Sequence, residues 1–118
     1  MTFEWLCPGV IVELPLPPVL GGWGLAGNHP VVVMGTDPEK REIYGLGCTS
    51  RPRREADYLL PRGVLALTRD TFVVTSMVRE LDESIWQQGR VLDRLPEPYM
   101  RELRQRARRA LRGKGLAR

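Results

Sequence analysis

Short apolar runs rich in β-branched residues recur along most of the chain, divided by proline, glycine and charged positions. Runs of this length at this spacing are typical of the strands of a small curled antiparallel sheet or barrel. The expected strands span residues 10–14, 31–34, 42–47, 58–60, 64–67, 72–78 and 89–92. The unbroken apolarity of residues 31–34 indicates burial on both faces, and Pro15 places the first strand near an edge of the sheet.

Residues 15–30 are expected to form a long loop. They hold four of the ten prolines and four of the twelve glycines, with Trp23 among them. Loops of this length are uncommon inside compact domains and frequently bind ligands. Trp23 is either a platform on which an unpaired base stacks or an apolar plug that pins the loop to the sheet.

The clearest helical pattern covers residues 97–112, with Gly113 just beyond it. Its apolar residues, at helical spacing, are Met100, Leu103, Ala107, Ala110 and Leu111. One face is expected to pack on the sheet, while the arginine-rich face is solvated or contacts RNA or an acidic partner. The sequence therefore predicts a mainly β fold with a C-terminal helix: one domain over residues 1–112 and a basic flexible tail at 113–118.

The net charge of +4 conceals an asymmetry, because residues 101–118 carry eight basic side chains against Glu102 alone. The remaining residues hold 10 basic and 13 acidic side chains, a balance of −3. A basic tail on a mildly acidic body can meet nucleic acid, an acidic partner segment or water.

The sequence shows no apolar run near the roughly 20 residues of a membrane helix, and no secretory signal at its start. We therefore expect no membrane association and a cytoplasmic location. Cys7 and Cys48 match no zinc or redox spacing and the chain has one histidine, so neither a metal site nor a cofactor is expected.

Residues 46–54 end an apolar strand abruptly in hydroxyl and guanidinium groups. The polar members of this run are Thr49, Ser50, Arg51, Arg53 and Arg54. The planar guanidinium fork matches phosphate oxygens, and hydroxyl groups add short donors. The run therefore points to RNA or DNA as a ligand.

Several segments occur together in one order. They are residues 29–33 (His-Pro-Val-Val-Val), 48–52 (Cys-Thr-Ser-Arg-Pro), 78–82 (Val-Arg-Glu-Leu-Asp) and 89–97 (Gly-Arg-Val-Leu-Asp-Arg-Leu-Pro-Glu). In this order and spacing the chain resembles the MazF/PemK (Kid) family of toxins from type II toxin–antitoxin modules, over nearly its whole length.

That resemblance implies an SH3-like β-barrel with helices that forms a symmetric homodimer. It implies a metal-independent endoribonuclease that cuts single-stranded RNA and is neutralised by an acidic antitoxin. Thr49 stands where the family has a catalytic or phosphate-binding threonine, and Arg79 keeps part of the closing pattern of its strand. His29 stands where the family usually has an arginine that contacts the scissile phosphate, and Val74 and Ser76 stand where PemK-type members have a catalytic arginine and aspartate.

Histidine is a sensible replacement because imidazole takes up and releases protons near neutral pH. The candidate catalytic residues are therefore Thr49 and His29. The candidate substrate-binding residues are Ser50, Arg51, Arg53, Arg54, Trp23 and Arg79. Each has a structural alternative: His29 and the hydroxyls could satisfy backbone groups, and the arginines could form a solvated surface.

Three functions compete. The first is the endoribonuclease toxin. The second is a catalytically silent relative that binds nucleic acid or protein through the same groove. The third is a gyrase poison like CcdB, a family that ends on an apolar tryptophan-containing tail, whereas this chain ends on a basic one.

Overall fold

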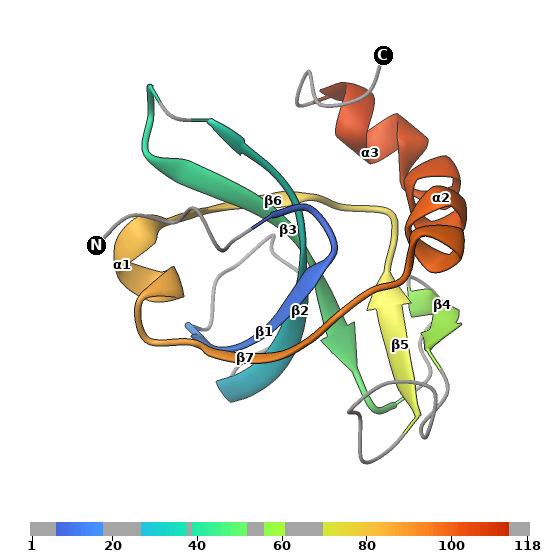
Figure 1. Cartoon of the computed structure of the whole chain (residues 1–118), viewed down its shortest axis with the longest axis horizontal. Coiled ribbons are helices and arrows are strands. Elements are labelled where there is room, and N and C mark those ends of the chain that lie inside the picture. Colours follow the sequence, from blue (N-terminus) through green and yellow to red (C-terminus); the bar gives the residue numbers. More distant parts are fainter. Residues whose placement is uncertain (1–6, 18–26, 38, 52–55, 61–69, 114–118) are drawn as a thin grey trace.

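Strand β3 (Glu42–Thr49) is paired along both of its edges and organises the sheet (Figure 1). The computed structural model describes residues 7–17, 27–37, 39–51, 56–60 and 70–113, with backbone only for 56 and 57. The other strands are β1 (Val10–Leu16), β2 (Gly27–Asp37), β4 (Ala56–Leu60), β5 (Thr71–Val74), β6 (Arg79–Asp82) and β7 (Arg90–Arg94). The helices are α1 (Glu83–Trp86), α2 (Glu97–Arg106) and α3 (Arg108–Gly113).

The strands pair antiparallel in the order β4-β5-β3-β2-β1-β7, and β6 pairs with β3. The sheet curls into a half-barrel (Figure 1). Helix α1 lies at one side of it, and α2 and α3 lie at the opposite side beside β4 and β5. The predicted mainly β, curled antiparallel class is confirmed.

The two central faces of the sheet are both buried. One face packs around Trp86 of α1, with Val31 and Val33 of β2 among its members. The other face, which includes Val32, is covered by apolar residues of α2 and α3 such as Leu103. Burial of successive β2 residues on opposite faces confirms the prediction from their unbroken apolar run.

The prediction of one loop over residues 15–30 is wrong at both ends. Pro15 belongs to β1, and β2 already begins at Gly27. Pro15 is tolerated because β7 pairs β1 only as far as Glu13. Pro30 is tolerated because β2 pairs with β3 only from Val31 onward. A proline lacks an N–H, so it fits where a neighbouring strand no longer pairs.

Strand β1 lies next to β7, the last strand of the order, which agrees with the expected position near an edge. A further expectation about the strands is wrong. The expected strand at 72–78 stops at Val74, and β6 lies where no strand was expected. Five residues lie between Val73 and Arg79, whereas only two lie between their β3 partners Cys48 and Gly45, so the extra residues break the pairing. The expected strand at 64–67 lies outside the described residues.

The C-terminal helix is correctly placed but is not one helix. Ala107 adopts φ −91° and ψ 8° and separates α2 from α3. Hydrogen bonds from the Ala107 N–H to the Leu103 carbonyl (2.9 Å) and from the Leu111 N–H to the Ala107 carbonyl (2.9 Å) still carry the helical connection across the joint. No glycine or proline stands there, so the sequence gives no signal for the break.

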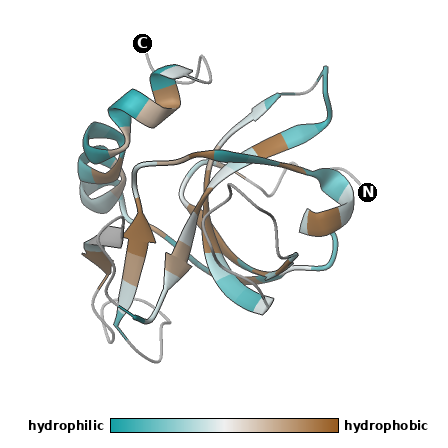
Figure 2. Ribbon diagram, turned by 180° about the vertical axis from the view of Figure 1, so that it is seen from behind, coloured by the Kyte–Doolittle hydropathy of each residue, from teal (hydrophilic) through white to brown (hydrophobic). Residues whose placement is uncertain are grey.

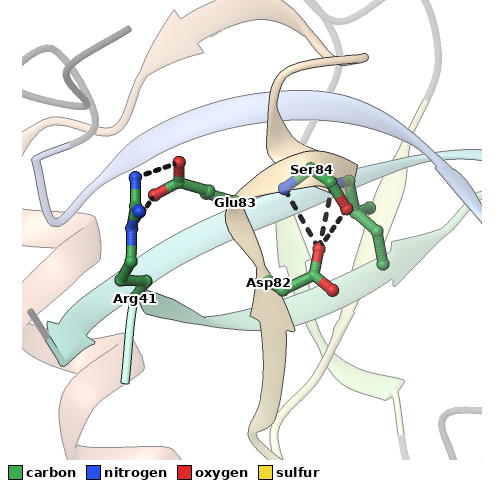
Figure 3. Close-up of polar contacts among 5 residues, drawn as sticks. Arg41, Asp82, Glu83 and Ser84 are labelled. Atoms are coloured by element: carbon green, nitrogen blue, oxygen red, sulfur yellow. Dashed lines mark hydrogen bonds and ion pairs between the residues drawn. The ribbon is translucent and has the colours of Figure 1, made fainter. Parts of the chain in front are cut away.

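Two polar contacts hold α1 to the rest of the fold (Figure 3). Arg41, in the left-handed region at φ 54°, donates from Nε and Nη2 to the Glu83 carboxylate at 3.0 and 2.7 Å. Asp82 caps the helix, since its Oδ1 accepts from the N–H groups of Ser84 (3.0 Å) and Ile85 (3.3 Å) and from the Ser84 hydroxyl. Because β6 leads directly into α1, these contacts fix where Trp86 enters the core.

Within the described residues no helix is both long enough and apolar enough to cross a membrane.

Gly45 is expected to reject any side chain. An added Cβ would lie 2.5 Å from Val31 Cγ1, 3.2 Å from the Val32 carbonyl oxygen and 3.3 Å from a ring carbon of Trp86. We predict that Gly45→Ala lowers the free energy of unfolding by about 1–3 kcal/mol, the usual cost of overpacking a core. Urea denaturation measures this; Gly113→Ala, where a Cβ meets nothing within 4 Å, is the control. Equal midpoints for the two variants would contradict the packing argument.

The Asp82 cap should make stability depend on pH. Its hydrogen bond from the Ser84 hydroxyl, and then those from backbone N–H groups, lower the pKa of the carboxyl from its ordinary 3.8. A lowered folded-state pKa adds stability above the unfolded pKa, and this contribution disappears as pH falls through the folded one. We predict that Asp82→Asn, which keeps a capping side chain, is less stable than wild type at pH 6 in urea titrations, and that the difference shrinks as the pH falls below 3.8. A difference independent of pH would show that the charge is not responsible.

Candidate functional site

The registers of five strands place a row of side chains across one face of the sheet. Leu14 of β1 lies opposite His29 of β2, and Thr49 of β3 lies opposite Phe72 of β5, which in turn lies opposite Leu59 of β4. The pairing of Val31 with Gly47, continued by two residues, sets His29 beside Thr49. The two residues nominated as catalytic therefore lie next to one another, between apolar neighbours.

The imidazole of His29 is held by the backbone of β3. Its Nδ1 lies 3.0 Å from the carbonyl oxygen of Cys48. A carbonyl only accepts, so Nδ1 carries the proton and, in the neutral ring, Nε2 carries the lone pair. Pro30 has no N–H, so the ring supplies a donor to β3 where the backbone of β2 cannot. His29 thus has a structural role.

Thr49 ends β3 and is 5% exposed. Its Oγ1 accepts the Arg51 N–H at 3.3 Å, a local turn that side-chain hydroxyls often make at strand ends. This bond uses a lone pair of Oγ1, so the hydroxyl hydrogen can still be donated to a phosphate oxygen. The structural and the functional interpretations of Thr49 are therefore compatible.

The predicted substrate-binding residues do not all lie near Thr49. Ser50 and Arg51 are exposed immediately beyond Thr49. Arg79 lies opposite Gly45, four residues before Thr49 along β3 and so about 13 Å away at the usual strand rise. Trp23, Arg53 and Arg54 lie outside the described residues, and their roles stay predictions.

Cys48, which directly precedes Thr49 in β3, offers no nucleophile. Burial raises the pKa of its thiol to about 12. A neutral buried thiol is unreactive, so the contribution of Cys48 is its carbonyl oxygen. Among the described residues, no three His, Cys, Asp or Glu side chains form a group able to hold a metal ion.

Sequence reasoning missed two neighbours of Thr49. Phe72 is half-buried and Leu59 is 42% exposed, and they continue the row beyond the hydroxyl. Aromatic rings beside a phosphate-binding group are typical platforms for unpaired bases. No sequence signal singles out these residues, because only the register of β3 with β5 and of β5 with β4 brings them to Thr49.

Comparisons with protein-family profiles and with curated proteins found no match. Solved structures do match. MazF from Deinococcus radiodurans superposes with a TM-score of 0.69 and 22% identity, covering 88% of this chain and 94% of that one. A MazE–MazF structure from the same organism gives a TM-score of 0.64 at 19% identity and covers 93% of this chain and 96% of that one. A second MazE–MazF structure gives a TM-score of 0.62 at 20% identity and covers 88% of this chain and 92% of that one.

The anchored ring predicts a definite tautomer. We expect ¹⁵N NMR of the one histidine in the chain to show Nδ1 protonated and Nε2 unprotonated at alkaline pH. Thr49→Ala should leave this pattern unchanged, since the bond goes to the Cys48 backbone. A neutral ring protonated at Nε2 would contradict the assignment.

Proposed function

We propose, from a MazF-like toxin fold, that this chain is a metal-independent endoribonuclease that cuts single-stranded RNA. The proposal is supported by the position of His29 and Thr49 at neighbouring ends of β2 and β3, with His29 Nδ1 3.0 Å from the Cys48 carbonyl oxygen. This arrangement supplies a proton acceptor and a hydrogen-bond donor at neighbouring positions. Metal-free RNA cleavage requires this combination.

The reaction would use the 2′-hydroxyl of the substrate as nucleophile. Nε2 of His29 takes its proton while the 2′-oxygen bonds to phosphorus. Thr49 donates its hydroxyl hydrogen to a non-bridging phosphate oxygen and stabilises the added charge. The bond to the 5′-oxygen then breaks, leaving a 2′,3′-cyclic phosphate. One imidazole cannot accept and donate at the same moment, so water or a group from a second protomer protonates the 5′-oxygen.

Exposed groups around the site fit a single-stranded substrate. Arg51 places a permanent positive charge beside Thr49, where it would attract the phosphate backbone. Phe72 offers a ring face to an unpaired base on the other side of Thr49. Double-stranded RNA keeps its bases stacked away from such a ring, which favours single strands as substrate.

A second candidate function is a silent relative that binds RNA without cutting it. Val74 is 2% exposed and apolar, at the position where the resemblance places a catalytic arginine. Nothing at that side chain can stabilise a phosphorane. The missing group is the positive charge of the arginine. If Arg51, His29 and Thr49 do not replace that charge, the site would bind RNA without cutting it.

The resemblance also leads us to propose a homodimer, a cognate acidic antitoxin and a cytoplasmic location. The antitoxin is supported by the MazE–MazF structures whose MazF-like fold this chain shares. We propose that it covers the face of the sheet that contains Thr49.

The test is incubation of the purified protein with mixed-sequence single-stranded RNA in EDTA. We expect defined cuts that leave 2′,3′-cyclic phosphate or 3′-phosphate ends. Thr49→Ala should lower the rate at least about tenfold, the scale of one lost transition-state contact, while Thr49→Ser keeps most of it. Thr36→Ala, an exposed threonine elsewhere on β2, is the matched control.

His29→Ala should both slow cleavage and remove the neutral-pH optimum, because the titrating base is lost. An unchanged pH profile would exclude His29 from proton transfer. Wild-type protein that binds RNA yet leaves it intact under all conditions would establish the silent binder instead.

A further inference from the structure

Four arginines on the C-terminal helices form a second charged surface, which we call the arginine surface. Its members are Arg101 of α2 and Arg108, Arg109 and Arg112 of α3. All four are exposed. A spacing of four residues puts Arg108 and Arg112 on one side of α3, and Arg101 lies on α2 before the break at Ala107.

The nearby acidic residues neutralise other arginines. Glu97 pairs with Arg104 at 3.0 Å, and Glu102 pairs with Arg106 at 3.2 Å. Arg106 also lies over the ring of Tyr58, 5.1 Å from its centroid. Within the described part of the chain, no ion pair involves any member of the arginine surface.

Helix stability explains only part of this arrangement. Cations near a helix C-terminus are favourable because they oppose the helix dipole, and this accounts for Arg112. The effect fades beyond one turn, so it does not account for Arg101. Like charges at neighbouring helical positions repel one another, so Arg108 and Arg112 weaken the helix unless an anion lies between them.

The chemistry of the surface favours phosphates over an acidic peptide. Protein partners are usually held by apolar or aromatic anchors in the centre of an interface. The large apolar residues Met100, Leu103 and Leu111 are buried against the sheet, so the exposed side offers guanidinium groups without such anchors. Guanidinium forks in a line match successive phosphate oxygens. The sequence then continues with Lys114 and Arg118 and no acidic residue.

The arginine surface is separate from the candidate site. Helix α3 lies at one end of the molecule, and the carboxyl end of β3 lies at the other, in both views (Figures 1 and 2). Figure 2 shows hydrophilic colouring along much of α2 and α3, in contrast to hydrophobic β5. We propose that the arginine surface binds the phosphodiester backbone of RNA at a second position, independent of cleavage at Thr49.

The test measures binding of a fluorescent 20-nucleotide 2′-O-methyl RNA, which has no 2′-hydroxyl nucleophile, as single strand and as duplex across a salt series. Arg108→Gln, Arg109→Gln and Arg112→Gln are combined, since glutamine keeps helix propensity. We expect at least about tenfold weaker binding at low salt and a log–log salt slope about two smaller for the single strand. Loss with the duplex alone would assign the surface to paired RNA.

The matched control removes three positive charges elsewhere: Lys40→Gln, Arg90→Gln and Arg94→Gln. If both triple variants lose affinity equally, the effect is net charge and the proposal fails. It also fails if polyglutamate, offered as an acidic peptide, binds the wild type and not the first variant while RNA binding is unchanged. The 2′-O-methyl probe cannot be cut, so failure of the proposed cleavage leaves this result standing.

Discussion

The fold depends on the capacity of β3 to pair along both of its edges. Its first half lies between β2 and β6, and its last two residues pair with β5. In the described part of the chain, β3 is the strand that connects β5 to β2. Gly45 permits the close approach of Val31 and Trp86 that this arrangement needs. Because β3 ends in Thr49, the packing that closes the sheet also positions the candidate site.

Local pattern was sufficient to predict the kind of fold and most of its strands. Short apolar runs placed β1, β3 and β7 to within a few residues, and helical spacing placed the C-terminal helices. The errors arose where pairing decides structure. Pro15 lies in a strand because β7 has already ended, and β5 stops because residues 75–78 do not fit the register of β3. Neither fact can be read from neighbouring residues.

The candidate site was predictable in its chemistry and less so in its geometry. Hydroxyl and imidazole groups at strand ends singled out Thr49 and His29, and their catalytic roles stay predictions. The tautomer of His29 follows from its contact with the Cys48 carbonyl oxygen. Every residue type carries this backbone atom, so the sequence cannot indicate which carbonyl oxygen makes the contact. Phe72 became a neighbour of Thr49 only through the register of β5. The sequence therefore predicted which kinds of side chain the site contains, but not which side chains lie next to one another on neighbouring strands.

The pairing of β1 with β7 has a consequence for synthesis of the protein. It joins Val10 to Arg94, so the sheet cannot close until most of the chain has left the ribosome. Folds dominated by such distant pairings also form slowly, since long loops must be ordered first. We infer that a nascent chain holds β1 without its second neighbour. A chain built this way would reach its complete fold only when translation was almost finished.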